Sequence, residues 1–204
     1  MVSKIYLASK SPRRKEILAG LGIEFDVVAV NDHTLLNFAG DEEQHPGEAP
    51  EDYVIRTACD KARAVLMKIE ADGLEKRPVL AADTTVIVNG EILGKPKDRH
   101  EAEAFLRAMA GTYHEVRTAV VVGTDPEHLV SDVSVSRVWF KALTEEEIAA
   151  YTATNEPYDK AGGYGIQGLA GLFIEKIEGS YTGIMGLPVF ETARLLKPFG
   201  VKVL

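Results

Sequence analysis

The stretch from residue 79 to residue 96 carries a carboxylate, hydroxyls and a lysine in an order that suits an active site. An apolar run leads to Asp83 and two threonines, and a second short apolar segment leads to Lys95. Asn89-Gly90 between the two runs predicts a hairpin, because both central residues of a type I′ turn need positive φ. The hairpin would bring Lys95 back toward Asp83. The alternative is a surface hairpin in which Asp83 only caps a turn.

A second group of polar residues surrounds the start of a predicted helix. Ser11 is a typical N-cap residue, and Pro12 suits the first helical position, where a missing N–H does no harm. A helix N-terminus offers free N–H groups and a partial positive charge, and Ser9, Arg13 and Arg14 lie around this one. That combination suits a phosphate group. The alternative is an ordinary capped helix with solvated arginines.

Two further side chains are candidates in different settings. Lys61 falls beside the apolar face of a helix predicted from Pro50, where it can lie along the edge of the face or point toward an anionic ligand. Gln167 lies in the segment 155–171, which has five glycines and neither helical nor strand periodicity. Such a backbone can approach a ligand closely, and the amide offers a donor and an acceptor to a base edge. A flexible loop between lobes is the alternative.

The composition is that of an ordinary globular chain and restricts its partners. The 204 residues are 46% hydrophobic and 26% charged, enough for one large domain or two closely packed lobes. The 23 basic and 31 acidic residues give a net charge of −8, which argues against a nucleic-acid or membrane surface. A single cysteine, Cys59, excludes an internal disulfide and fits a reducing compartment. No apolar run has the length of a signal peptide or membrane span, so the predicted location is cytoplasmic.

Hydrophobic periodicity and capping residues predict the elements that position these candidates. Strands are predicted at 5–8, 25–30, 79–88, 114–122, 130–140 and 172–177, with Val133, Val135, Val138 and Phe140 as the apolar side of the fifth. Helices are predicted from Pro12, Pro50, Asp98, Thr144 and Pro188, with capping boxes at Asp98 and Thr144. The helix from Pro50 presents an apolar face made of Val54, Ala58, Ala62, Val65 and Ile69. Residues 31–48 and 179–183 are predicted to be loops.

Cations outnumber acids among the candidate site residues although the chain as a whole is acidic, which points to a polyphosphate ligand. The sequence lacks the phosphate-binding loop of P-loop enzymes, the glycine fingerprint of dinucleotide-binding folds, a zinc-spaced Cys/His set and a serine-hydrolase elbow. Its five histidines are scattered without a ligand pattern.

Taken together, these motifs resemble those of the Maf family of nucleoside triphosphate pyrophosphatases, in the family's order and over nearly the whole chain. The matching segments are Leu7-Ala8-Ser9 through Leu18, Ala82-Asp83-Thr84, Leu93-Gly94-Lys95-Pro96, Glu156-Pro157 and Asp159 through Gly168. The Gly-Ile-Gln form of the last segment is similar to the branch that prefers dTTP and UTP over 7-methyl-GTP.

The resemblance implies a cytoplasmic, house-cleaning hydrolase that needs Mg²⁺ or Mn²⁺ and cleaves a nucleoside triphosphate between its α- and β-phosphates. It implies one Maf-like domain over residues 1–204 with two lobes around a central cleft. The implied fold is an elongated mixed α/β sheet with flanking helices, like that of inosine triphosphate pyrophosphatases. A homodimer is implied, and no nucleic acid or membrane partner is expected.

The resemblance also implies roles for individual residues. The implied proton acceptor and metal ligand is Asp83, the further catalytic residues are Lys61 and Lys95, the phosphate site includes Ser9 and Arg14, and pyrimidine selectivity falls to Arg13, Thr84 and Gln167. In one place the chain departs from the family, reading Asn31-Asp32-His33-Thr34 where a glutamate usually stands in an Asp-x-Asp-Glu-like context. Asp32, Glu42 or Glu43 could supply that carboxylate.

Two other functions remain open from the sequence. One is a pyrophosphatase for non-standard purine triphosphates on the same kind of fold. The other is a nucleotide-binding regulator of cell division that does not turn its ligand over. The presence of Asp83, Lys61 and Lys95 favours turnover, whereas the altered segment 31–34 favours the regulator.

Overall fold

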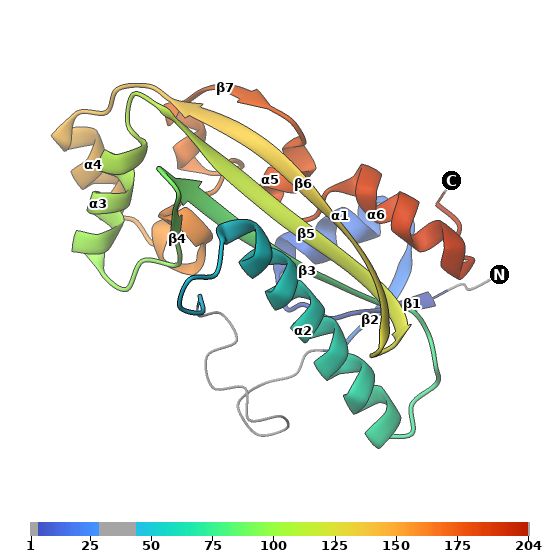
Figure 1. Ribbon diagram of the computed structural model, residues 1–204. Coiled ribbons are helices and arrows are strands. Elements are labelled where there is room, and N and C mark those ends of the chain that lie inside the picture. The colour runs from blue at the N-terminus through green and yellow to red at the C-terminus, as the bar shows by residue number, and fades with distance from the viewer. Residues whose placement is uncertain (1–3, 29–43, 204) are drawn as a thin grey trace. The chain divides into compact units, whose positions relative to one another are not determined.

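The computed structural model of the protein describes residues 4–28 and 44–203, which form a seven-stranded mixed sheet with flanking helices (Figure 1). The strands are β1 (Lys4–Leu7), β2 (Glu24–Val27), β3 (Val79–Val88), β4 (Glu91–Leu93), β5 (Tyr113–Asp125), β6 (His128–Phe140) and β7 (Ile174–Glu178). They lie in the order β2-β1-β3-β5-β6-β7, and β4 pairs with β3. β1 is parallel to β2 and β3, whereas β4 is antiparallel to β3 and β7 to β6. The predicted mixed α/β class is confirmed.

The helices also follow the predicted order. They are α1 (Pro12–Gly20), α2 (Pro50–Ala71), α3 (Arg99–Met109), α4 (Glu145–Thr152), α5 (Tyr181–Met185) and α6 (Val189–Leu196), with 3₁₀ turns at Pro157–Asp159, Ala161–Gly163, Leu169–Phe173 and Lys197–Phe199. Within residues 4–28 and 44–203, none of these helices combines the length and apolar character that crossing a bilayer requires.

The chain forms two compact units. The first comprises Met1–Asp83, Thr118–Val133 and Gly186–Leu204, and the second comprises Thr84–Arg117 and Ser134–Met185. The boundaries fall within β3, β5 and β6, so that one residue of a strand can belong to a different unit from the next.

In the first unit, α2 covers one face of the sheet. The residues of its predicted apolar face are all buried, and they pack on side chains from alternate positions of three strands, namely Tyr6, Ala8, Val79, Ala81, Ala119 and Val121. Alternate residues of a strand point to opposite faces, so Ile5, Leu7 and Leu80 are buried on the other side. Figure 1 shows α1 and α6 behind these strands and α2 in front of them.

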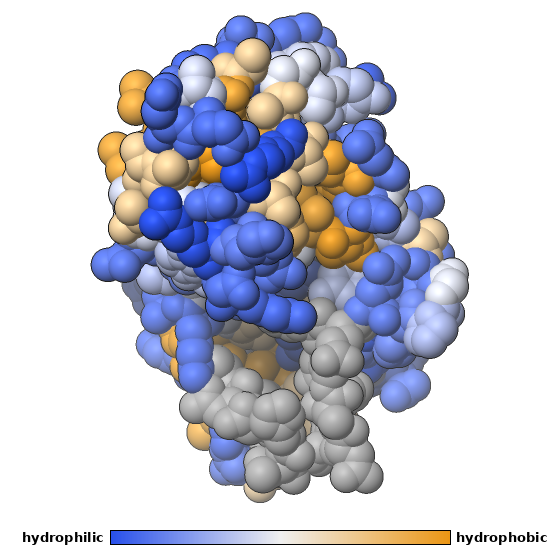
Figure 2. All heavy atoms as spheres, turned by 90° about the vertical axis from the view of Figure 1, so that its left-hand side faces the viewer, coloured by the Kyte–Doolittle hydropathy of each residue, from blue (hydrophilic) through white to orange (hydrophobic). Residues whose placement is uncertain are grey.

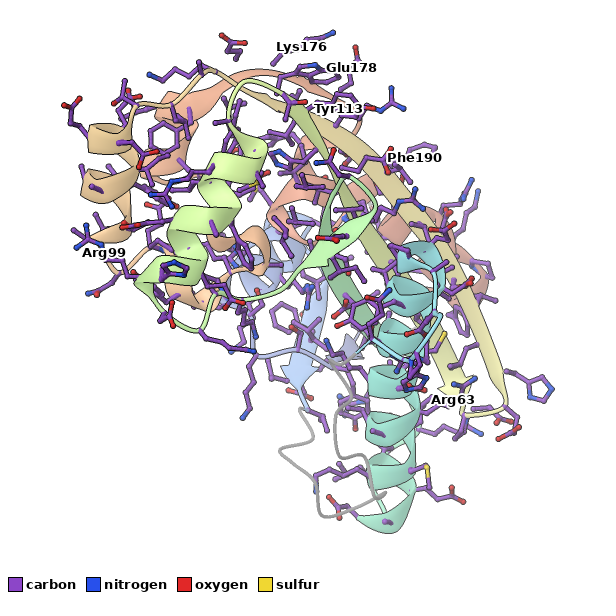
Figure 3. All side chains as sticks on the ribbon, turned by 60° about the vertical axis from the view of Figure 1, so that its left-hand side comes forward. Arg63, Arg99, Tyr113, Lys176, Glu178 and Phe190 are labelled. Atoms are coloured by element: carbon purple, nitrogen blue, oxygen red, sulfur yellow. The ribbon has the colours of Figure 1, made fainter. Side chains whose placement is uncertain are left out.

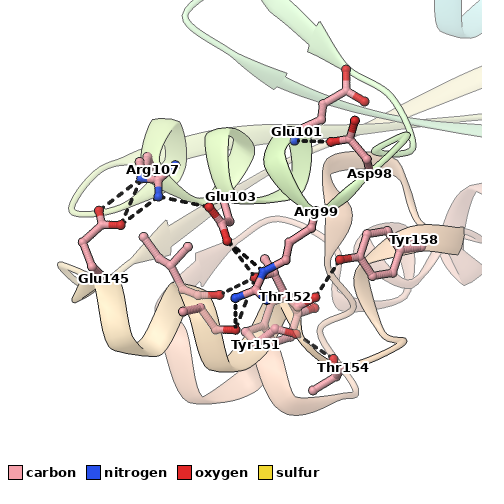
Figure 4. Close-up of polar contacts among 12 residues, drawn as sticks. Asp98, Arg99, Glu101, Glu103, Arg107, Glu145, Tyr151, Thr152, Thr154 and Tyr158 are labelled. Carbon is pink, nitrogen blue, oxygen red and sulfur yellow. Dashed lines mark hydrogen bonds and ion pairs between the residues drawn. The ribbon is translucent and has the colours of Figure 1, made fainter.

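In the second unit, α3 and α4 lie side by side over an aromatic-rich core. Leu106 and Met109 of α3 and Ile148 and Tyr151 of α4 are buried there with Phe140 of β6. Arg107 of α3 donates to both carboxylate oxygens of Glu145 at the start of α4, at 2.8–3.3 Å (Figure 4). Hydrophilic residues cover most of the face that carries these two helices (Figure 2).

The predicted N-caps at Asp98 and Thr144 are confirmed, but the capping box predicted at Asp98 is not. Thr144 and Glu147 form a reciprocal capping box at the start of α4. At α3 the Asp98 side chain accepts a hydrogen bond from the Glu101 N–H at 2.9 Å, but the Glu101 carboxylate accepts from Lys97 N–H at 2.6 Å rather than from Asp98. The cap is therefore present, while the second half of the box is shifted by one residue.

The predicted apolar side of β6 is wrong at Val135, which is 47% exposed, while Ser134 and Ser136 are buried. The reason is the close approach of the chain before and within α5. A Cβ at Gly179 would lie 2.7 Å from Ser136 Oγ, and one at Gly183 would lie 2.8 Å from Ser134 Oγ. Only small side chains fit facing these glycines, so the serines take the inward positions.

The segment predicted as a loop over 179–183 is also partly wrong, because Tyr181–Met185 forms α5. Ser180 precedes this helix, and its Oγ accepts the Gly183 N–H at 3.0 Å.

The outer face of the sheet formed by β5, β6 and β7 carries a row of aromatic and charged side chains. Tyr113 and Lys176 (Figure 3) both contact Trp139 of β6 there: the Tyr113 and Trp139 ring centroids lie 5.5 Å apart, and Lys176 Nζ lies 4.6 Å from the centroid of the Trp139 ring.

Candidate active site

Asp83 lies at the point where the most deeply buried part of β3 ends. The four residues before it, Val79 to Ala82, have no exposed surface, and Asp83 itself is 7% exposed. Lys61 of α2 places its Nζ 2.5 Å from Asp83 Oδ1. Ala58 and Ala62, one on each side of Lys61 on the helix, are fully buried against the sheet, and their small side chains let α2 come close to β3.

This ion pair gives the middle of β3 a defined chemistry. Both side chains are largely removed from water, with exposed fractions of 27% for Lys61 and 10% for Asp83, so their attraction is stronger than that of a surface pair. The ammonium group fixes the orientation of the carboxylate through a charge-assisted hydrogen bond. A carboxylate so oriented can accept a proton from water or bind a hard cation through its remaining lone pairs.

The N-terminus of α1 is built as predicted and holds Arg14 in place. Ser11 is the N-cap, and its side chain accepts from the Arg14 N–H, with Pro12 at the first helical position. Buried Ser9 accepts hydrogen bonds from Ser11 N–H at 3.2 Å and from the Arg14 guanidinium at 3.3 Å. Arg14 Nε donates to the Gly186 carbonyl at 2.8 Å.

The result is an oriented cation beside the positive end of a helix, a setting that favours an anion. The first turn of α1 contains no acidic residue that would repel an anion there. Arg13, in the same turn, is half-buried.

In the second unit, the hairpin and the glycine-rich segment meet. Asn89 and Gly90 have φ of 51° and 83°, as the predicted type I′ turn requires, and β4 leads to exposed Lys95. The Gly162 N–H donates to the Gly94 carbonyl at 3.0 Å, immediately before Lys95. The structure therefore brings the lysine end of the hairpin next to the segment that contains Gln167.

Gln167 is exposed at the tip of a turn whose upstream flank is anchored in the core. Tyr164 is 6% exposed, and its hydroxyl lies 2.6 Å from Nε2 of buried His114. Both rings pack edge-on against Phe140. Burial raises the pKa of the Tyr164 hydroxyl and lowers the pKa of His114 to about 4, so both groups are neutral near pH 7.

The predicted site residues thus fall into two groups. Lys61 contacts Asp83, and Ser9 contacts Arg14, all within the first unit, together with Arg13. Thr84, Lys95 and Gln167 belong to the second unit, and Thr84 is half-buried on β3 directly after Asp83. Their convergence around one ligand stays a prediction.

The metal assignment rests on Asp83. Among residues 4–28 and 44–203, no group of three or more His, Cys, Asp or Glu side chains could hold a metal ion. A single carboxylate nevertheless fits Mg²⁺, which proteins usually bind through one or two carboxylates together with substrate phosphates. The other candidates, Asp32, Glu42 and Glu43, lie outside the described residues.

Cys59 takes no part in this chemistry. It is half-buried on α2, and burial raises the pKa of its thiol, which disfavours the reactive thiolate.

Two contributors to the site region were missed by sequence reasoning. His114 belongs to no ligand pattern in the sequence, although it lies two residues before buried Val116 on the same face of β5, and that alternation is a usable signal. Glu156 is part of a sequence motif, but the motif does not reveal that its carboxylate holds the chain that follows Gln167. That contact spans 13 residues and has no signature in the local pattern.

Comparison with known proteins identifies the family. Residues 4–199 match the family described as Maf-like protein, and the chain belongs to it. A dTTP/UTP pyrophosphatase of Bordetella avium (strain 197N) is 50% identical over 202 residues, which cover 97% of this chain and 96% of the relative. One of Chromobacterium violaceum is 49% identical over 201 residues, covering 98% of this chain and 97% of the relative.

Among solved structures, a HAM1 protein from Coxiella burnetii is similar with a TM-score of 0.45. It is 15% identical, and the match covers 68% of this chain and 73% of that one. The family assignment rests on the sequence matches.

Proposed function

We propose that this protein hydrolyses dTTP and UTP to the nucleoside monophosphate and pyrophosphate. The observation that carries the proposal is sequence identity. The protein is 49–50% identical, over 97–98% of its chain, to relatives named dTTP/UTP pyrophosphatase. The oriented Asp83 carboxylate and the cationic start of α1 support it, because cleaving a phosphoanhydride needs a proton acceptor and positive charge near the phosphates.

In the proposed reaction, Asp83 accepts a proton from the attacking water. The water oxygen bonds to the α-phosphorus, the bond from that phosphorus to the α–β bridging oxygen breaks, and pyrophosphate leaves with the bonding electrons. Lys61 orients the Asp83 carboxylate and adds positive charge beside it. Arg14, held by Ser9 and the Gly186 carbonyl, binds phosphate oxygens, as does Lys95.

Pyrimidine recognition is assigned to Arg13, Thr84 and Gln167. The Gln167 amide can both donate to and accept from a base edge, as can the Thr84 hydroxyl, whereas the Arg13 guanidinium can only donate. We assign a divalent cation, Mg²⁺ or Mn²⁺, to the substrate complex, with Asp83 as its protein ligand. When bound, it supplies charge neutralisation at the phosphate oxygens and acidifies bound water. We also propose that the protein is cytoplasmic and forms a homodimer. Sedimentation of the purified chain tests the dimer.

The test is an assay of pyrophosphate release from UTP, dTTP, ITP and 7-methyl-GTP with Mg²⁺ or Mn²⁺ present. We expect turnover of UTP and dTTP, and a fall of at least about a hundredfold in kcat for Asp83→Asn, the scale of general-base catalysis. Nucleotide binding should persist in that variant. Exclusive turnover of ITP would support the purine alternative, and binding without pyrophosphate release would support the regulator.

Asp60→Asn is the matched control. Like Asp83, Asp60 has a largely buried carboxylate, but it lies on α2. It pairs with Arg56 and Arg63 rather than with a predicted site residue. It should keep turnover close to that of the unmodified protein. Near-normal turnover in Asp83→Asn would refute the assigned role of Asp83.

A further inference from the structure

Gln167 occupies a defined place in a tight turn. The Gly168 N–H donates to the Gly165 carbonyl at 3.0 Å, which closes a four-residue turn with Gln167 in the third position. The next turn follows at once, because the Gly171 N–H donates to the Gly168 carbonyl at 3.0 Å. The direction in which the Gln167 amide is presented therefore depends on how both flanks of the turn are held.

Glu156 holds the downstream flank. Its Oε2 accepts the Leu169 N–H at 2.8 Å, and its Oε1 accepts the Ala170 N–H at 3.2 Å. Oε1 also accepts the Tyr151 hydroxyl at 3.0 Å. Hydrogen bonds from N–H groups to a charged carboxylate are stronger than those to a neutral acceptor, so one side chain secures two successive peptide groups.

Tyr151 supports Glu156 from the core. It is buried on α4 with an exposed fraction of 4%, and its hydroxyl donates to Glu156 Oε1 at 3.0 Å. The downstream flank of the turn that carries Gln167 is thus held by one pair of side chains, from the end of α4 and the residues just after it.

Gly168 shows how closely the carboxylate is packed on the turn. A Cβ at position 168 would lie 2.4 Å from both carboxylate oxygens of Glu156. The φ of Gly168 is −104°, which alanine can adopt, so the obstacle is the carboxylate and not the backbone conformation. Any side chain at position 168 must displace Glu156 from its backbone partners.

We propose that Glu156 is a positioning residue for base selection, which it exerts by orienting the turn that presents Gln167. This inference rests on the proposed function. Uracil and thymine carry an N–H and a carbonyl where cytosine carries an acceptor nitrogen and an amino group. An amide distinguishes the two patterns only if it is held in one orientation, because a free amide can turn over and satisfy either.

The test compares kcat and KM for UTP and for CTP in Glu156→Gln and Gly168→Ala. The first variant replaces one acceptor oxygen by a donor that faces a backbone N–H, and the second displaces an intact carboxylate. We expect both to raise KM for UTP with a smaller change in kcat. The UTP-to-CTP ratio of kcat/KM should fall about tenfold, the scale of one lost hydrogen bond. Glu175→Gln, on exposed β7, is the control and should keep the ratio.

A general loss of folded protein would lower both rates together and leave the ratio unchanged, so the ratio separates positioning from stability. A ratio within twofold of the original in both variants, with thermal unfolding unaltered, would overturn the proposal. Should a variant not fold, amide hydrogen exchange in the unmodified protein decides. Protected Leu169 and Ala170 amides support the proposal, and unprotected ones refute it. A protein that releases pyrophosphate from neither UTP nor dTTP would instead contradict the proposed function.

Discussion

The folding stability of this protein should depend on pH through His114. The side chain is 1% exposed, its ring packs edge-on against Phe140 and Tyr164, and its Nε2 lies 2.6 Å from the Tyr164 hydroxyl. Among the described residues, its Nδ1 has no hydrogen-bond partner. A protonated imidazole would place a charge in this apolar setting, and burial therefore lowers the pKa of His114 from 6.5 to about 4.

The sign and size of the effect follow from linkage. Between pH 6.5 and 4 the unfolded chain binds a proton at this histidine and the folded chain does not, so the free energy of unfolding falls as the pH falls. The pKa difference corresponds to about 3 kcal/mol in total, of which about 2 kcal/mol is lost on going from pH 7 to pH 5. Above the unfolded pKa the contribution no longer changes.

The measurement is urea unfolding at pH 7, 6 and 5 for the unmodified protein and for His114→Gln. Glutamine does not titrate and keeps a polar group that can reach the Tyr164 hydroxyl. Carboxylates titrate alike in both proteins, so the difference between the two pH profiles isolates His114. We expect the unmodified protein to lose about 2 kcal/mol more than the variant between pH 7 and pH 5.

His100→Gln provides the control, because His100 is exposed on α3 and its replacement should leave the pH profile unchanged. Parallel profiles for the unmodified protein and His114→Gln would refute the reasoning, and so would a steeper profile in the variant.

Two further substitutions test the fold of the second unit by urea unfolding. Thr144→Ala removes the side-chain half of the capping box with Glu147 and should cost about 1 kcal/mol, so an unchanged midpoint would contradict the cap. Gly162→Ala should cost about 2–4 kcal/mol, because the residue has φ of +71° and its Cβ would lie 2.8–2.9 Å from the Val86 side chain. Gly20→Ala, which meets no atom within 4 Å, is its control and should not destabilise.

Much of the fold could be predicted from the sequence because its signals are local. The N-caps at Ser11, Asp98 and Thr144 and the turn at Asn89-Gly90 depend on hydrogen bonds or dihedral angles within three or four residues. The hydrophobic periodicity of α2 also predicted its buried face correctly, because one face of this helix packs on one sheet. These features identify the elements and the candidate residues.

Only the tertiary structure decided which of those residues meet. Lys61 reaches Asp83 across 22 residues, and the spacing alone left open whether the lysine lay along the helix edge or pointed at a partner. The inward serines of β6 contradict its apolar pattern because the glycines of the chain around α5 approach too closely for valine. Glu156 holds the Gln167 turn through a hydrogen bond from Leu169, which lies 13 residues further along the chain. In each case the outcome depends on how closely two distant segments pack, a quantity that local sequence does not encode.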